Sequence, residues 1–171
     1  MSTAKQKQET IVYIRWMIGE DLSKVLLIET ESFEFPWTKN DFVCCLRQRN
    51  CIGMVVEHEN EVEDKVVGFM IYEVYKPGIE ILNFAVHPDW RRQRIGTQMI
   101  RKLIGKLSAK SRKEIVLAVR ETNLSAQLFF KECGFKAFTT LRKYYDDVRE
   151  HYGNISEDAY LMRYQYKAPQ E

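Results

Sequence analysis

A strand end, a basic turn and the start of a helix follow one another in FAVHPDWRRQRIGT, residues 84–97, and the expected architecture can be built around this segment. Phe84 to Val86 reads as the end of a strand, and His87-Pro88-Asp89 closes it. From Ile95 onward, apolar residues recur at helical spacing. A helix that follows a strand in this way is a crossover connection, so the next strand, Glu114 to Val119, runs parallel to the first.

The same reasoning, carried outward in both directions, predicts the remaining elements. Alternating and β-branched runs predict strands at Thr10–Met17, Cys51–Glu57, Lys65–Tyr75, Ile79–Val86, Glu114–Val119, Phe135–Arg142 and Ala159–Tyr166, with a turn at Glu57–Asp64. Helical spacing and capping residues predict helices at Asp21–Phe33, Thr38–Arg49, Ile95–Leu107 and Asn123–Cys133. We therefore expect an α/β (α+β) fold with a mixed, mostly antiparallel sheet of about seven strands, about four flanking helices and a locally parallel, splayed strand pair.

Composition limits the class of protein. The chain has 171 residues, which predicts a single domain, residues 1–171, with a core of about 11–166. Apolar residues make up 45% and charged residues 29%, as in ordinary globular proteins, and a net charge of +2 provides no global field for nucleic acid or membrane. The first residues lack the apolar core of a secretory signal, so we expect a cytoplasmic protein. The cysteines, Cys44, Cys45, Cys51 and Cys133, are expected to be reduced packing residues.

The turn before the helix predicts an anion site. From Arg91 through Lys113 there are nine basic residues and no acidic one. The first N–H groups of a helix are unpaired and attract anions, and Gly96 leaves room for a phosphate to approach. A solvated helix face explains Arg101, Lys102, Lys106 and Lys110, but not the crowding of Arg91, Arg92 and Arg94 in one turn. The expected ligand is a compact polyanion such as a pyrophosphate.

Several motifs, in the same order along the chain, resemble those of the GNAT N-acetyltransferases. Arg91-Arg92-Gln93-Arg94-Ile95-Gly96 resembles the acetyl-CoA signature Gln/Arg-x-x-Gly-x-Gly/Ala. LAVRETN (117–123) and LFFKECGF (128–135) look like the second cofactor segment. Phe35-Pro36-Trp37 and RKYY (142–145) resemble the RimI-like branch, whose members acetylate protein N-termini, in the type case the N-terminal alanine of a small-subunit ribosomal protein. The resemblance covers about Ile11 to Met162.

The resemblance implies roles for particular residues in a single GNAT-type domain that uses acetyl-CoA as cosubstrate and no metal. The strand edge at Phe84, Ala85 and Val86 would pair with the pantetheine amides, and the backbone N–H of Val86 would stabilise the oxyanion after direct attack of the amine. The pyrophosphate would contact Arg91, Arg92, Gln93, Arg94, Ile95, Gly96 and Thr97. Asn123 and Phe130 would lie along the cofactor. Phe35, Pro36, Trp37, Tyr144 and Tyr145 would wall the peptide groove, although Trp37 has core packing as an alternative.

The sequence departs from the family at three positions. Arg94 replaces the usual first glycine of the signature. Arginine is tolerable there if its φ stays negative and its side chain faces outward, where it could add a phosphate contact, whereas affinity should suffer if the position needs a positive φ. Ala118 occupies the position of the catalytic glutamate, and Phe130 that of the tyrosine that protonates the thiolate. We expect Glu80 to replace the base, in an apolar strand setting that can raise its pKa, and Tyr144 or Tyr145 to replace the acid. A solvent-exposed strand charge for Glu80 and groove packing for the tyrosines are the alternatives.

These observations favour an N-acetyltransferase that acts on a protein N-terminal α-amine. An α-amine has a pKa near ~7.7–8.0 and a lysine amine near ~10.4, so an enzyme without a strong base is better suited to the α-amine. The acceptor would be a peptide or protein N-terminus, with a ribosomal protein as a candidate, and a monomer is favoured. The alternatives are a lysine or small-molecule amine acetyltransferase and a non-catalytic acyl-CoA-binding domain. Nucleic-acid binding is disfavoured because no recognised motif accompanies the basic residues.

Overall fold

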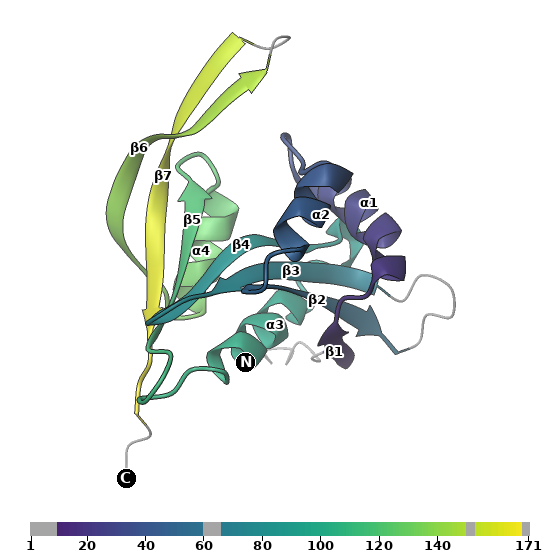
Figure 1. Ribbon diagram of the computed structural model, residues 1–171, viewed down its shortest axis with the longest axis vertical. Coiled ribbons are helices and arrows are strands. Elements are labelled where there is room, and N and C mark those ends of the chain that lie inside the picture. Colours follow the sequence, from purple (N-terminus) through teal and green to yellow (C-terminus); the bar gives the residue numbers. More distant parts are fainter. Residues whose placement is uncertain (1–9, 60–65, 150–152, 169–171) are drawn as a thin grey trace, which may run out of the picture. The chain divides into compact units, whose positions relative to one another are not determined.

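The structure, a computed structural model, describes residues 10–59, 66–149 and 153–168. Its strands are β1 (Val12–Trp16), β2 (Cys51–His58), β3 (Val66–Val74), β4 (Gly78–Val86), β5 (Glu114–Arg120), β6 (Lys136–Arg149) and β7 (Gly153–Gln165). Its helices are η1 (Gly19–Asp21), α1 (Leu22–Ser32), α2 (Lys39–Leu46), η2 (Pro88–Trp90), α3 (Ile95–Ile104) and α4 (Leu124–Glu132). The strands form one sheet in the order β1-β2-β3-β4-β5-β7-β6, in which β4 and β5 are parallel (Figure 1). The predicted fold class is confirmed.

The chain divides into two compact units. The first comprises Met1–Glu73 and Asn83–Leu103, and the second Val74–Leu82 and Ile104–Glu171. Strand β4 supplies residues to both. Among the described residues, none of the helices is both long and apolar enough to cross a membrane.

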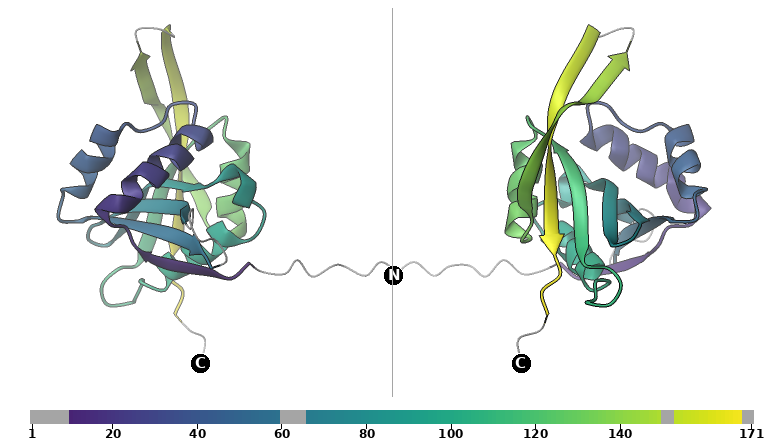
Figure 2. Two further views of the ribbon diagram at one scale, coloured as in Figure 1. Left: turned by 90° about the vertical axis from the view of Figure 1, so that its right-hand side faces the viewer. Right: turned by 60° about the vertical axis from the view of Figure 1, so that its left-hand side comes forward.

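In the first unit, helices cover both faces of the strands. α1 and α2 lie on one side of β2 and β3, and α3 lies on the other (Figures 1 and 2). α3 buries Ile95, Met99, Ile100 and Leu103, which its helical repeat places on one face. Burying each such side chain stabilises the fold by about 1.5–3 kcal/mol. The apolar spacing that predicted this helix therefore marks its core face.

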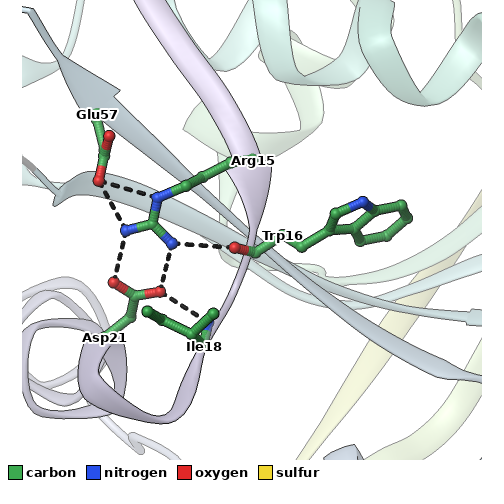
Figure 3. Close-up of polar contacts among 5 residues, drawn as sticks. All are labelled: Arg15, Trp16, Ile18, Asp21 and Glu57. Atoms are coloured by element: carbon green, nitrogen blue, oxygen red, sulfur yellow. Dashed lines mark hydrogen bonds and ion pairs between the residues drawn. The ribbon is translucent and has the colours of Figure 1, made fainter.

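A clamp of hydrogen bonds around Arg15, on β1, ties η1 to the sheet (Figure 3). The guanidinium donates two hydrogen bonds to Asp21 at the end of η1, at 2.7 and 2.8 Å, and two to Glu57 on β2, at 2.7 and 2.9 Å. Asp21 also accepts the backbone N–H of Ile18 at 2.8 Å. Burial opposes ionisation of Asp21, but the bonds from Arg15 and Ile18 outweigh it and lower its pKa. The clamp fixes where β1 ends and α1 begins.

In the second unit, β6 and β7 form a hairpin that pairs with β5 along β7. Both strands exceed the predicted Phe135–Arg142 and Ala159–Tyr166. The register shifts between Leu141 and Tyr145, where Lys143 takes φ 52°. The extension lacks the apolar alternation by which strands are recognised in a sequence.

Helix ends follow local chemistry. The predicted capping box is confirmed: Thr38 Oγ1 accepts the N–H of Asp41 at 3.2 Å, and the Asp41 carboxylate accepts the N–H of Thr38 at 2.7 Å. Gly134, at φ 94°, stops α4 as predicted. Two predicted helices are too long. α2 ends at Leu46, where the chain turns, and α3 ends at Ile104 before a glycine.

The predicted turn after β2 and the predicted role of the cysteines have other outcomes. The turn predicted at Glu57–Asp64 lies largely outside the described residues, and β2 itself continues to His58. None of the four cysteines, all of which are described, forms a disulfide, as predicted, but Cys44 is exposed on α2, so its assignment as a packing residue is wrong.

Candidate active site

The basic turn lies in the first unit, between the end of β4 and α3. His87 begins η2, and its Nδ1 accepts the N–H of Asp89 at 3.2 Å. Arg92 and Arg94 then take φ values of 64° and 62°. Left-handed residues within a turn arrange backbone N–H groups into an anion-binding concavity, and the unpaired N–H groups of the first turn of α3 follow directly. The residues Arg91–Thr97, termed here the cofactor turn, therefore fit a pyrophosphate group.

Two side chains of the cofactor turn are held by the protein itself. Arg91 donates to the carbonyl oxygen of Val86 at 2.8 Å and to Ser32 Oγ at 2.9 Å. Gln93 accepts the hydroxyl of Thr10 at 2.9 Å. These contacts orient the turn, which the sequence reasoning had assigned wholly to the phosphates. Sequence reasoning missed Ser32 and Thr10, because no local pattern links them to Arg91 and Gln93, which lie far along the chain.

Arg92 and Arg94 remain exposed. Arg94 adopts the positive φ for which the family signature has glycine. This conformation costs an L-residue with a side chain roughly 1–2 kcal/mol in free energy, because its Cβ comes too close to the backbone. The sequence argument made negative φ the condition for tolerating arginine there, and the structure does not meet that condition.

The aromatic segment Phe35-Pro36-Trp37 also belongs to the first unit, in the connection between α1 and α2. All three residues are half-buried. The Trp37 ring meets Phe42 edge to face, with 5.3 Å between centroids. Its backbone N–H donates to the carboxylate of Glu29 on α1 at 2.6 Å. Trp37 thus packs against the first unit on one side and keeps part of its surface exposed on the other.

Glu29 is a residue that the sequence reasoning missed. It is 1% exposed, and its second oxygen accepts the amide of Asn83 on β4 at 3.0 Å. A signal was available, since Glu29 lies four residues after Val25 and therefore on the buried face of α1. A glutamate on an apolar helix face indicates either a pairing partner or a functional role.

In the second unit, Glu80 lies on β4 in register with Val116 on β5. Ala118, two residues beyond Val116, shares that face of the sheet because side chains alternate along a strand. Pairing between the two strands ends at Ile81 and Leu117. Glu80 therefore occupies the same sheet face as the position at which the family carries its glutamate, one side-chain step earlier.

Tyr144 and Tyr145 lie on β6, with their rings edge to face at 4.9 Å between centroids. The hydroxyl of Tyr145 donates to the carbonyl oxygen of Ala118 at 3.2 Å, and the guanidinium of Arg120 lies 4.0 Å from the centre of its ring. Tyr144 is 48% exposed. Partial burial and then the negative charge of Glu80 raise its pKa, so it stays protonated.

The two other cofactor residues expected in this unit are engaged in the fold. Asn123 caps α4 through its side-chain oxygen, which accepts the N–H of Ala126 at 3.0 Å. Phe130 is 6% exposed and packs edge to face on Phe129 and Phe135, at 5.1 and 5.4 Å. The ring of Phe130 thus serves the core, where a tyrosine would have carried a hydroxyl.

Comparison with known proteins agrees with these features. Residues 16–135 match the acetyltransferase (GNAT) family. The [ribosomal protein bS18]-alanine N-acetyltransferase of Salmonella typhimurium is 28% identical over 142 residues, which cover 83% of this chain and 89% of that protein. The crystal structure of the Escherichia coli ribosomal-protein-S18-alanine N-acetyltransferase has a TM-score of 0.75 at 25% identity, covering 94% of this chain and 97% of that one.

A third similarity concerns the fold alone. The crystal structure of Arabidopsis thaliana NAA60 in complex with a bisubstrate analogue has a TM-score of 0.76 at 17% identity, and covers 91% of this chain and 98% of that one. The matched family spans the end of β1, the cofactor turn and α4. The chain belongs to the acetyltransferase (GNAT) family and is an acetyl-CoA-dependent N-acetyltransferase.

Proposed function

We propose that the acceptor is the free α-amine at the N-terminus of a protein, with a ribosomal protein as the leading candidate. The observation that carries this proposal is the missing carboxylate at Ala118, with Glu80 on the same sheet face as the replacement. The pKa of an α-amine lies about one unit above pH 7, and the pKa of a lysine amine lies about 3.4 units above it. A base in a displaced position can therefore deprotonate an α-amine more readily than a lysine amine. The similarity to bacterial ribosomal-protein alanine N-acetyltransferases supports the same acceptor.

The cofactor turn would hold the pyrophosphate of acetyl-CoA. Arg92 and Arg94 supply positive charge beside the backbone N–H groups of Ile95, Gly96 and Thr97. Arg91 and Gln93 would act mainly by keeping the turn in shape, given their bonds to Val86, Ser32 and Thr10. The strand edge of Phe84, Ala85 and Val86, beyond the last β4 residue that pairs with β5, would take the pantetheine amides. Bound acetyl-CoA supplies an activated thioester carbonyl.

Proton transfer would fall to residues of the second unit. Glu80 would accept the proton of the incoming ammonium group. Tyr144, whose pKa is raised by burial and by Glu80, would keep the hydroxyl hydrogen that an acid must donate. Tyr145 would contribute less to proton transfer, because its hydroxyl already donates to Ala118. Asn123 and Phe130 would act through the shape of α4.

Phe35, Pro36 and Trp37 would contact the first residues of the acceptor peptide. Aromatic and proline side chains exclude water from a peptide groove, which strengthens the polar contacts that orient the amine. We further propose that residues 1–171 act as one N-acetyltransferase domain, that the protein is a monomer, and that it works in the cytoplasm, where newly made N-termini and acetyl-CoA occur together.

A matched pair of peptides tests the acceptor. One has a free N-terminus and no lysine, and the other has an acetylated N-terminus and a single internal lysine. Mass spectrometry after incubation with acetyl-CoA should show acetylation of the first only. Acetylation of the second alone would replace the proposal with a lysine acetyltransferase. If neither peptide reacts while acetyl-CoA binds, a small-molecule acceptor or a non-catalytic acyl-CoA-binding role takes precedence.

A further inference from the structure

The carboxylate of Glu29 is buried and bound on both oxygens. Oε1 accepts the backbone N–H of Trp37 at 2.6 Å, and Oε2 accepts the side-chain amide of Asn83 at 3.0 Å. Glu29 is 1% exposed, and Asn83 is 7% exposed. Both of these donors are neutral, and burial raises the pKa of Glu29. Burying a carboxylate between neutral donors is a poor way to stabilise a fold, so its role is to be sought in what it holds.

Glu29 joins two segments to which the proposed function gives separate tasks. Trp37 is the last residue of the aromatic segment that would contact the acceptor. Asn83 directly precedes Phe84, the first residue of the strand edge that would contact pantetheine. The Trp37 ring already packs against Phe42, and the hydrogen bond that its backbone N–H donates to Glu29 fixes the backbone as well. One side chain of α1 therefore sets the spacing between the acceptor segment and β4, all within the first unit.

The end of the same helix contacts the cofactor turn. Ser32 Oγ accepts a hydrogen bond from the guanidinium of Arg91 at 2.9 Å, and a carboxylate oxygen of Glu31 lies 3.0 Å from Nε2 of His87. The last turn of α1 thus meets the aromatic segment, β4 and the cofactor turn. Glu29 is the buried contact among these, whereas Glu31 is exposed. Because both oxygens of Glu29 are engaged by protein donors, it is not placed to take a proton from substrate.

We propose that Glu29 is a positioning residue for the acceptor, which holds the Phe35-Pro36-Trp37 segment at a fixed distance from β4. The inference rests on the proposed role of that segment in binding the acceptor peptide. Losing one buried hydrogen bond of this kind corresponds to about 1 kcal/mol, or about fivefold in an equilibrium constant. The effect should appear in KM for the peptide, and not in the affinity for acetyl-CoA.

Two substitutions of similar size separate positioning from other roles. Glu29→Met removes both acceptors. Glu29→Gln keeps one oxygen for the N–H of Trp37 and offers its amide to Asn83, whose own amide can turn to present its oxygen. We expect Glu29→Met to raise KM for the N-terminal peptide about fivefold, with kcat and acetyl-CoA affinity within about twofold of wild type. Glu29→Gln should restore the wild-type KM.

The outcomes divide cleanly. A wild-type KM in Glu29→Met, or an equal loss in both variants, overturns the inference. A matching loss of kcat or of acetyl-CoA affinity does so as well, because the residue would then act on chemistry or on the whole fold. Hydrogen exchange of the wild-type protein adds a test that needs no variant: the amide of Trp37 should be protected, and exchange at the rate of a free peptide contradicts the proposal. Wild-type turnover is measured first, since its failure on any peptide refutes the proposed acceptor, not the role of Glu29 in holding Trp37.

Discussion

Tyr145 donates its hydroxyl hydrogen to the backbone of Ala118, the residue at which a glutamate would be expected from the family pattern. The neighbouring Tyr144 keeps an exposed ring next to the charge of Glu80. The two adjacent tyrosines of β6 therefore have different surroundings, and the difference can be measured.

We expect Tyr144→Phe to lower kcat at least tenfold, because it removes the hydroxyl that we propose protonates the leaving thiolate. Tyr145→Phe should leave kcat within about threefold and lower the free energy of unfolding by about 1 kcal/mol, the value of one hydrogen bond. Steady-state kinetics and urea denaturation of both variants check this. A larger kcat loss in Tyr145→Phe would assign the acid to that residue instead.

Glu80→Gln should lower turnover at least tenfold near neutral pH and alter the dependence of rate on pH, since the variant lacks the carboxylate that we propose accepts the proton of the amine. Glu114→Gln is the matched control. Glu114 also lies in the second unit, where it bonds to Tyr75 at 3.2 Å and pairs with Arg163 at 3.6 Å. If Glu80→Gln and wild type give the same pH profile, the base is a water molecule or another group.

Arg94→Gly should stabilise the protein relative to Arg94→Ala by about 1 kcal/mol, because only glycine adopts φ near 62° without a steric penalty. Both variants remove the same charge, so the comparison isolates the backbone. Urea denaturation gives the difference, and calorimetry with acetyl-CoA shows what the charge adds. Equal stabilities would mean that the turn relaxes to another conformation when the arginine is removed.

Arg92→Glu should weaken binding of acetyl-CoA at least tenfold, which corresponds to about 1.4 kcal/mol, because it reverses the charge in the cofactor turn. Lys110→Glu makes the same change of net charge at an exposed residue beyond α3. Calorimetry at one salt concentration should show a much smaller effect for this control. An unchanged affinity in Arg92→Glu would show that the phosphates of acetyl-CoA do not bind at the cofactor turn.

Asp21→Asn should make stability less dependent on acid pH. The folded-state pKa of Asp21 lies below its ordinary value of 3.8, so its ionised form stabilises the fold above that value, and this contribution is lost as pH falls below it. At pH 7 the substitution should cost about 2 kcal/mol, as it breaks charged hydrogen bonds from Arg15. Denaturation curves of both proteins should therefore converge toward pH 2. Parallel curves would show that the carboxylate contributes nothing through its charge.

Much of the fold could be predicted from the sequence because local chemistry marked it. The helical spacing from Ile95, the capping pair of Thr38 and Asp41, and the stop at Gly134 depend on residues within a few positions of one another. The parallel strand pair followed from the crossover helix that comes after Val86. The extended hairpin was missed, since pairing of polar strands leaves no periodic signal.

The candidate site was predicted less completely, for a related reason. The residues expected to contact a ligand were proposed from motifs, but the residues that hold them in place were not. Arg91 meets Ser32 across 59 positions, and Tyr145 meets Ala118 across 27. Such contacts arise only when packing brings elements together. The positive φ of Arg94 was likewise a property of the folded turn, and no feature of its neighbours in the sequence announced it.

The β6–β7 hairpin has a practical consequence for anyone who would express part of this chain. The family match ends at residue 135, just before β6 begins. A fragment cut at residues 16 and 135 would lose β7, and with it every antiparallel partner of β5 from Glu114 to Arg120. It would also lose Arg15 and leave Asp21 and Glu57 without their shared cation. An uncovered strand edge of that length recruits other chains, so such a fragment should precipitate, and a useful truncation must keep residues 10 to 168.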